Sequence, residues 1–241
     1  ALSLAAPQNA GVILLEEGDI LSNGWEVESI GRYAGIDAGG RWAAMVNTTE
    51  PGSESDTAIV ADGQLLMAEG DVLADGSTLR FLSAIDVDQD GTVALVYRTE
   101  LAGTGLNERR LQLGPHIVFR QGDAVSLPAL PASSTFSSFS TVDLALPYAL
   151  LTAEVKTPSS APFDVAMLLD FSVGGIGAPP TLTVVALEGA TPAALPGPIF
   201  SLGARGDVAT DGSYVLPVTC GVGGNLQYAV GTNTGWLALP G

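Results

Sequence analysis

The sequence "QLLMAEGD" occupies residues 64–71, and two close copies of it, "VILLEEGD" at 12–19 and "HIVFRQGD" at 116–123, share its spacing. Gly18, Gly70 and Gly122 are separated by 52 residues at each step. A weaker copy, "LTVVALEGA" at 182–190, has Ala190 in place of the aspartate and follows after 67 residues. Each copy is a short apolar run that ends at a glycine, which predicts a β-strand followed by a tight turn. We call these turns the EGD turns.

A second motif recurs with the same period. "DAGGRWAAM" at 37–45 and "DQDGTVALV" at 88–96 both read Asp-x-x-Gly-x-x-Ala, which predicts a turn between antiparallel strands. The third copy, "DLALPYALL" at 143–151, has Leu146 for the glycine, and the fourth, "ATDGSYVLP" at 209–217, has Ala209 for the aspartate. Two more apolar segments accompany these motifs in each unit, and no stretch shows a sustained helical period.

The spacing predicts an all-β, β-propeller-like fold with four repeats of about 50 residues, each of four strands. The repeats are expected at 24–71, 77–123, 134–190 and 197–241, within a single domain at 24–241 that follows an N-terminal arm at 1–23. The closing strands are expected to include 12–16, 64–68, 116–120 and 182–186, and the first three EGD glycines to share one conformation. A β-solenoid and two packed β-sandwiches are the alternatives, and the long, regular period disfavours both.

These motifs resemble those of secreted bacterial tandem-repeat, β-propeller-like proteins, whose units carry Asn/Asp-x-x-Gly-x-x-Ala and an EGD-like strand end. The resemblance covers residues 12–241. It implies the repeated fold and says almost nothing about an activity.

Composition narrows the classes of partner. The chain has 241 residues, of which 46% are hydrophobic and 15% are charged, and its net charge is −17 with Lys156 as the only lysine. This charge opposes binding to nucleic acid and to anionic membranes. No apolar run reaches the length of a membrane span, so we expect no membrane insertion. The sequence starts at Ala1 without a methionine, and we therefore expect a secreted, extracellular or cell-surface protein.

Few residues of the chain are suited to catalysis, and we expect no enzyme. His116 is the only histidine and Cys220 the only cysteine, which is too few for a usual zinc site and makes a Ser-His-Asp site depend on His116 alone. Cys220 is expected to pack as a small apolar residue. The EGD carboxylates recur at one structural position, so a role in the turn explains them better than a catalytic pair.

One acidic stretch, "DVDQDG" at 86–91, matches the beginning of a calcium loop. Asp86, Asp88 and Asp90 alternate ahead of Gly91, as carboxylates do when they wrap a calcium ion. Ala94 and Tyr97 occupy the later positions at which such a loop supplies ligands. An acidic turn is therefore the favoured interpretation, and calcium is the only cofactor that the sequence suggests.

The N-terminal strand is one too many for four complete repeats. Val12, Ile13, Leu14 and Leu15 form a closing strand with no repeat before it. Three arrangements are open to this strand: it clasps the last repeat of its own chain, it pairs with a preceding partner lost by processing, or it inserts into the next molecule by strand addition. In the last case a variant without residues 1–19 should be a folded monomer that no longer polymerises.

These observations favour a structural protein, a subunit of an extracellular filament or surface layer that assembles with copies of itself, head to tail. The alternative is a binding module that recognises a polysaccharide or a surface protein through loops such as 99–110 and 156–164. An enzyme that uses aspartates on glycosides is the third hypothesis.

Overall fold

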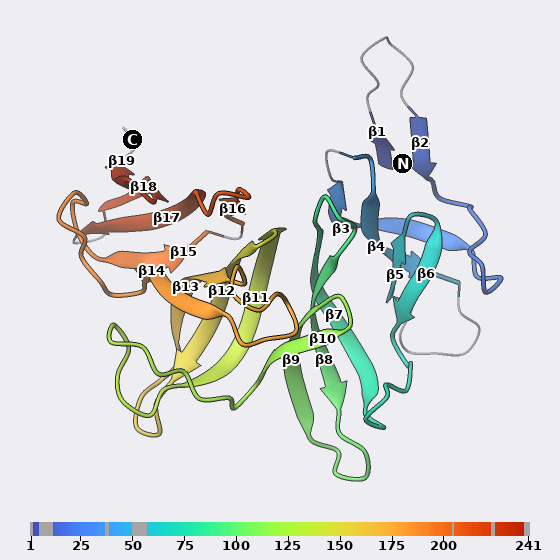
Figure 1. Cartoon of the computed structure of the whole chain (residues 1–241), viewed down its shortest axis with the longest axis horizontal. Coiled ribbons are helices and arrows are strands. Elements are labelled where there is room, and N and C mark those ends of the chain that lie inside the picture. The colour runs from blue at the N-terminus through green and yellow to red at the C-terminus, as the bar shows by residue number, and fades with distance from the viewer. Residues whose placement is uncertain are drawn as a thin grey trace. The chain divides into compact units, whose positions relative to one another are not determined.

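The described residues form strands and turns and no helix (Figure 1). The computed structural model describes residues 2–4, 12–36, 39–49, 57–203, 205–222 and 225–238. Its strands make four larger antiparallel sheets and one two-stranded pair. The all-β prediction is therefore confirmed. None of the described residues forms a helix that could span a lipid bilayer.

Each larger sheet comes from one continuous stretch of chain, as the repeats predict. The first sheet contains β3 Val27–Ile36, β4 Trp42–Thr48, β5 Thr57–Ala61 and β6 Gln64–Ala68. The second contains β7 Thr78–Val87, β8 Val93–Glu100, β9 Asn107–Leu113 and β10 His116–Arg120. The third contains β11 Thr135–Ala145, β12 Tyr148–Lys156, β13 Phe163–Asp170 and β14 Thr181–Leu187.

The fourth sheet contains β15 Ile199–Leu202, β17 Tyr214–Val222, β18 Asn225–Thr232 and β19 Gly235–Ala238, with the short β16 Asp207–Val208 paired to β17. The N-terminal pair consists of β1 Leu2–Leu4 and β2 Val12–Leu15. The predicted closing strands correspond to β2, β6, β10 and β14, and β2 ends one residue earlier than expected. Residues 1 and 5–11 of the predicted arm lie outside the described residues.

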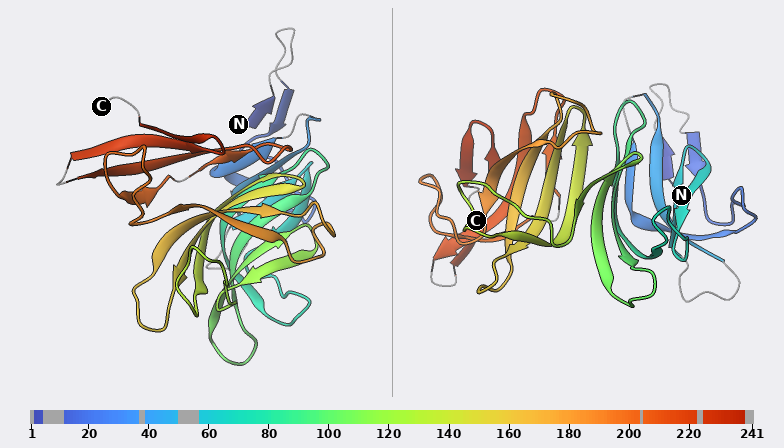
Figure 2. Two further views of the ribbon diagram at one scale, coloured as in Figure 1. Left: turned by 60° about the vertical axis from the view of Figure 1, so that its left-hand side comes forward. Right: turned by 60° about the horizontal axis from the view of Figure 1, so that its bottom comes forward.

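Contacts divide the chain into two compact units, residues 1–109 and 110–241, with the boundary inside β9. Within the first unit, Met45 and Ile59 of the first sheet pack with Tyr97 of the second sheet. Within the second unit, Leu150 of the third sheet packs with Leu216 of the fourth, and Figure 2 shows these two sheets, yellow-orange and red, as adjacent layers.

The central strands are buried on both faces. In β4 every residue except Asn47 is buried, and in β12 five consecutive residues are buried. A strand covered on both faces has no solvent side on which to place polar residues, so its sequence is almost continuously apolar. This pattern, together with the sheet-on-sheet clusters, accounts for the high apolar content of the chain.

The Asp-x-x-Gly-x-x-Ala motif lies at the turn before the second long strand of each larger sheet, and the structure of this turn shows why the third copy of the motif lacks its glycine. Gly40, Gly91 and Gly212 all have positive φ, at 83°, 78° and 79°, whereas Asp37 of the first motif lies outside the described residues. In the third unit, Leu146 and Pro147 form a two-residue turn with a cis peptide bond between them.

This turn is shorter than the turns of the other units. The alignment of the third unit with the first is therefore displaced by one residue. Ala43 packs toward the following sheet, but in β12 the side chain that does so is Leu150. The predicted match of Ala149 to Ala43 is therefore wrong by one position, because the glycine-free turn is shorter than the others.

Candidate functional site

The EGD turns share one backbone conformation. Gly18, Gly70 and Gly122 have φ angles of 92°, 95° and 94°, and Gly189 of the weaker fourth copy has 80°. A side chain disfavours these angles and glycine does not. The prediction that the first three glycines are equivalent is confirmed, so the period reflects a repeated three-dimensional structure.

The aspartate of each EGD turn accepts a hydrogen bond from the main chain three residues earlier. The Oδ2 atoms of Asp19, Asp71 and Asp123 lie 2.8, 2.8 and 2.7 Å from the backbone nitrogens of the residues at those positions. Ala190 has no carboxylate with which to make this bond. These contacts support the interpretation of the recurrent carboxylates as parts of the turn.

Each EGD turn also binds the first strand of the next sheet. The Gly70 N–H donates to the Leu79 carbonyl at 2.8 Å, and the Leu79 N–H donates back to the Asp71 carbonyl at 2.8 Å. The other three turns repeat this exchange, each with a glycine N–H to carbonyl distance of 2.8 Å, at Val27, Phe136 and Ile199. The turn therefore joins the closing strand of one sheet to the opening strand of the next.

The first EGD turn makes the same bonds, but the strand before it has no full sheet. Among the described strands, β2 pairs only with β1, in antiparallel register. The EGD turn that follows β2 gives this strand the position of a closing strand. Its pairing, however, places it in a sheet of two strands. This is the feature that the sequence predicted as a surplus strand.

The predicted assembly residues differ in their surroundings. Ile13 is 58% exposed, whereas Leu15 is 4% exposed and packs in a cluster with Ala44 and Val46 of the first sheet. Leu14 lies against the same cluster, and the side chain of Val12 is outside the described part. Deleting residues 1–19 would therefore uncover an apolar face of the first sheet, so it is a poor test of strand donation.

The calcium prediction receives no support from the geometry. Asp88 is buried, and its Oδ1 accepts a hydrogen bond from the Asp90 N–H at 2.7 Å, while the Asp90 carbonyl accepts one from Arg41. Asp86 lies beside Gly35 of the first sheet. Among the described residues, no group of three or more His, Cys, Asp or Glu side chains is arranged to hold a metal ion.

The single cysteine and two of the tryptophans pack within the structure, whereas His116 lies at the surface. Cys220 is buried in the cluster between the third and fourth sheets, as expected. Trp42 is buried, and the Trp236 ring covers Gly231. His116 is exposed beside Gly177, at a hollow of about 350 Å³ lined mostly by apolar residues and prolines.

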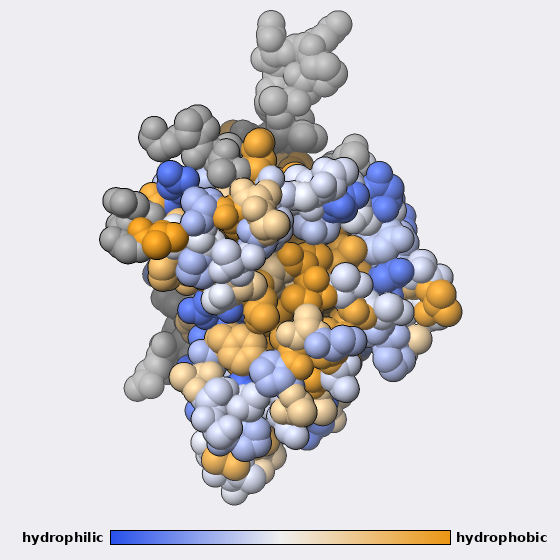
Figure 3. Space-filling model, turned by 90° about the vertical axis from the view of Figure 1, so that its left-hand side faces the viewer, coloured by the Kyte–Doolittle hydropathy of each residue, from blue (hydrophilic) through white to orange (hydrophobic). Residues whose placement is uncertain are grey.

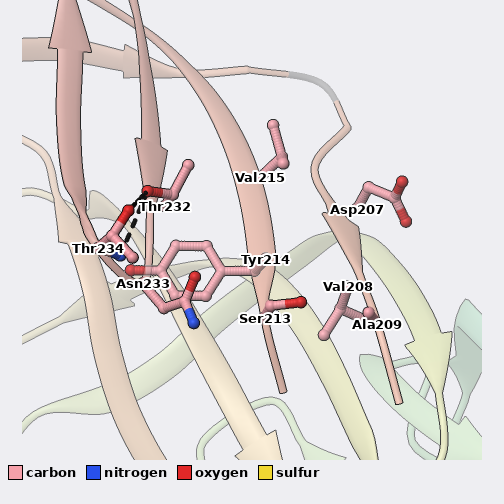
Figure 4. Close-up of a pocket in the computed structure, with 9 residues that line it drawn as sticks. All are labelled: Asp207, Val208, Ala209, Ser213, Tyr214, Val215, Thr232, Asn233 and Thr234. Carbon is pink, nitrogen blue, oxygen red and sulfur yellow. Dashed lines mark hydrogen bonds between the residues drawn. The ribbon is translucent and has the colours of Figure 1, made fainter. Parts of the chain in front are cut away.

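A second hollow, of about 340 Å³, opens beside β16, β17 and the turn after β18, and sequence reasoning missed it because its residues come from separate strands. Its lining consists of Asp207, Val208, Ala209, Ser213, Tyr214, Val215, Thr232, Asn233 and Thr234. Burial raises the pKa of Tyr214. Figure 4 shows the Asp207 carboxylate directed away from the Tyr214 ring, so these two titratable groups do not form an acid–base pair.

Two comparisons with known proteins give no match. No family model matches the chain, and no curated protein matches it.

Proposed function

We propose that this chain is an extracellular structural subunit that assembles head to tail by β-strand addition and has no catalytic role. The observation that carries the proposal is the place of β2. It leads into an EGD turn like the closing strands β6, β10 and β14, yet it belongs to no sheet of four strands. A closing strand without its sheet is suited to complete a sheet of another molecule.

We also infer that the four units are propeller-like blades. Within each compact unit, the two neighbouring sheets bury apolar side chains against one another. The same EGD turn links every sheet to the next. Both features are typical of four-stranded blades in tandem.

The acceptor of the strand is the free edge of the fourth sheet. Among the described strands, β19 is the last of that sheet and pairs only with β18, and β2 pairs only with β1. Each strand thus presents unpaired N–H and C=O groups along one edge, which favours pairing with another strand. Fully burying a side chain such as Ile13 is worth about 1.5–3 kcal/mol, and the loss of subunit freedom offsets part of that gain.

The test compares the full chain with a variant that lacks residues 1–13. This deletion removes β1 and half of β2 but keeps Leu14, Leu15 and the EGD turn, and so preserves the cover of the first sheet. We expect electron microscopy to show filaments of the full chain, and sedimentation to show a folded monomer of the variant. Filaments of the truncated chain would contradict strand donation, and a full chain that stays monomeric at every concentration would contradict assembly.

A second candidate function is the binding of a neutral polysaccharide at the hollow beside Tyr214. The observation in its favour is the mixture of an aromatic ring with the hydroxyl and amide groups of Ser213, Thr232, Asn233 and Thr234. Sugars commonly need an apolar ring and several hydrogen-bonding groups. Glycan-array binding by the monomer that is lost in Tyr214→Ala would support this function, and no binding to any glycan would remove it.

A further inference from the structure

The last sheet of the chain leaves one of its faces open. Leu216, Val218 and Cys220 of β17 are buried against the third sheet. Their neighbours in the strand point to the opposite side, which we call the outer face of the fourth sheet. The register places on this face Val215, Pro217, Thr219 and Gly221 of β17, Leu226, Tyr228, Val230 and Thr232 of β18, and Gly235 and Leu237 of β19.

The outer face is apolar and exposed. Tyr228, Leu237 and Leu226 are 72%, 65% and 60% exposed, and none of the residues that the register places on the face is charged. Figure 3 shows one side of the molecule, without residue labels, and on this side apolar surface gathers near the centre of the view. A contiguous apolar surface is unusual on a monomer and typical of a protein–protein contact.

The corresponding face of the first sheet is buried in this chain. Met45, Ile59 and Met67 lie side by side on β4, β5 and β6, and they pack against the second sheet. The equivalent row of the fourth sheet is Pro217, Val230 and Leu237, which lie side by side on β17, β18 and β19. The repeat itself therefore indicates what fits the outer face, namely the opposite face of a following sheet.

In the described part of the chain, the opposite face of the first sheet is covered by the arm and not by another sheet. Ala44, Val46 and Val60 point to the side away from the second sheet, where they pack with Leu15, Leu21 and Trp25. In the first unit, the second sheet has a four-stranded neighbour on the equivalent face. Among the described residues, the first sheet has residues 14–25 of the arm on this face and no four-stranded neighbour.

We propose that the outer face of the fourth sheet receives residues 12–25 of a second copy of this chain, which cover the first sheet of that copy. This inference rests on the proposed strand addition and names the surface that accompanies it. The strand β2 extends the edge at β19, and the face beside that edge packs on residues 14–25 where they cover the first sheet of the incoming copy. The contact continues the order of sheets found along each chain, so every added copy offers the same open face again.

Electrostatic repulsion between approaching copies opposes this assembly. Each copy carries a net charge of −17, and the apolar face holds no cation to offset it. Salt screens repulsion between like-charged molecules, with a Debye length of about 30 Å at 0.01 M and about 8 Å at 0.15 M. Assembly is therefore expected to strengthen as ionic strength rises, and an interface held by ion pairs would show the reverse.

The experiment uses two blocked variants of the full protein. The double variant Tyr228→Asp, Leu237→Asp places charge on the outer face at exposed positions, and the variant without residues 1–13 lacks the incoming strand. Val173→Asp, at an 84% exposed apolar residue in the loop between β13 and β14, is the matched control. We expect the double variant to weaken assembly at least about thirtyfold in sedimentation, and the control to assemble like the natural chain.

Mixing the two blocked variants tests whether the N-terminal strand of one copy binds the outer face of another copy. One retains its strand and the other retains its outer face, so an equimolar mixture should form a one-to-one dimer and stop there. Dimers of the truncated variant alone would show two outer faces in contact and overturn the proposal. If the double aspartate variant assembles normally while the truncated chain does not, strand addition stands and the outer face is not its receiving surface. If no variant or natural chain assembles at all, both proposals fall.

Discussion

Replacing the glycine of an EGD turn tests whether its positive φ explains the repeat. Gly70 has a φ of 95°, and a Cβ added there would meet nothing within 4 Å. The cost of Gly70→Ala is therefore conformational and not steric. The left-handed region costs an alanine about 1–2 kcal/mol, and the stiffer unfolded chain returns about 0.4–1 kcal/mol. We expect a net loss of about 1 kcal/mol, or roughly a fivefold lower ratio of folded to unfolded protein.

Two further substitutions make this prediction specific. Gly122→Ala should cost the same amount, because its φ is 94° and the space around it is equally open. Gly70→Asn should cost less than Gly70→Ala, since asparagine tolerates positive φ better than alanine does. A loss that is equal for alanine and asparagine would show that φ is not the reason for the glycine.

The assay is urea unfolding at 25 °C, followed by tryptophan fluorescence and by circular dichroism. Coincident transitions by the two probes are needed before the midpoints are converted to free energies. An unchanged midpoint for Gly70→Ala would refute the conformational argument. A loss above about 3 kcal/mol would show that the added Cβ meets atoms that the structure places elsewhere, since backbone strain alone does not reach that value.

Three other substitutions are expected to change stability. Ala190→Asp should restore the carboxylate that the other EGD turns use and raise the free energy of unfolding by about 0.5–1.5 kcal/mol, measured in the same urea assay. Thr152→Val should stabilise the protein by about 1 kcal/mol, because no hydrogen-bond partner lies within reach of the buried Thr152 hydroxyl in the described structure; a less stable variant would reveal a partner. The pKa of Asp164 is raised by burial and by the neighbouring Glu188 and Glu154, so its ionised form is disfavoured in the folded state and this penalty disappears as the pH falls through the raised pKa. Asp164→Asn should therefore stabilise the protein at pH 7 by about 0.2–1 kcal/mol, with a gain that shrinks in acid unfolding series toward pH 4, and a gain independent of pH would contradict the assignment.

The sequence alone determined the class of fold and the unit of repetition. The spacing of the EGD motif located β6, β10 and β14 and predicted one conformation for their glycines, because a turn that needs positive φ leaves glycine as the favoured residue. The apolar runs predicted strands, since the central strands of stacked sheets are buried on both faces. The surplus N-terminal strand was also visible, because a repeat can be counted.

The tertiary structure decided which face each side chain occupies and which surfaces remain open. A two-residue turn at Leu146 shifted the third unit by one position, and a shift of one residue moves every side chain of a strand to its other face. Contacts between distant segments determine three further features. Leu15 is buried within its own chain, the three aspartates Asp86, Asp88 and Asp90 do not converge, and the row of side chains that includes Leu237 is exposed. Local sequence pattern encodes the strand and its turn, but only the stacking of sheets determines which apolar surfaces are already covered.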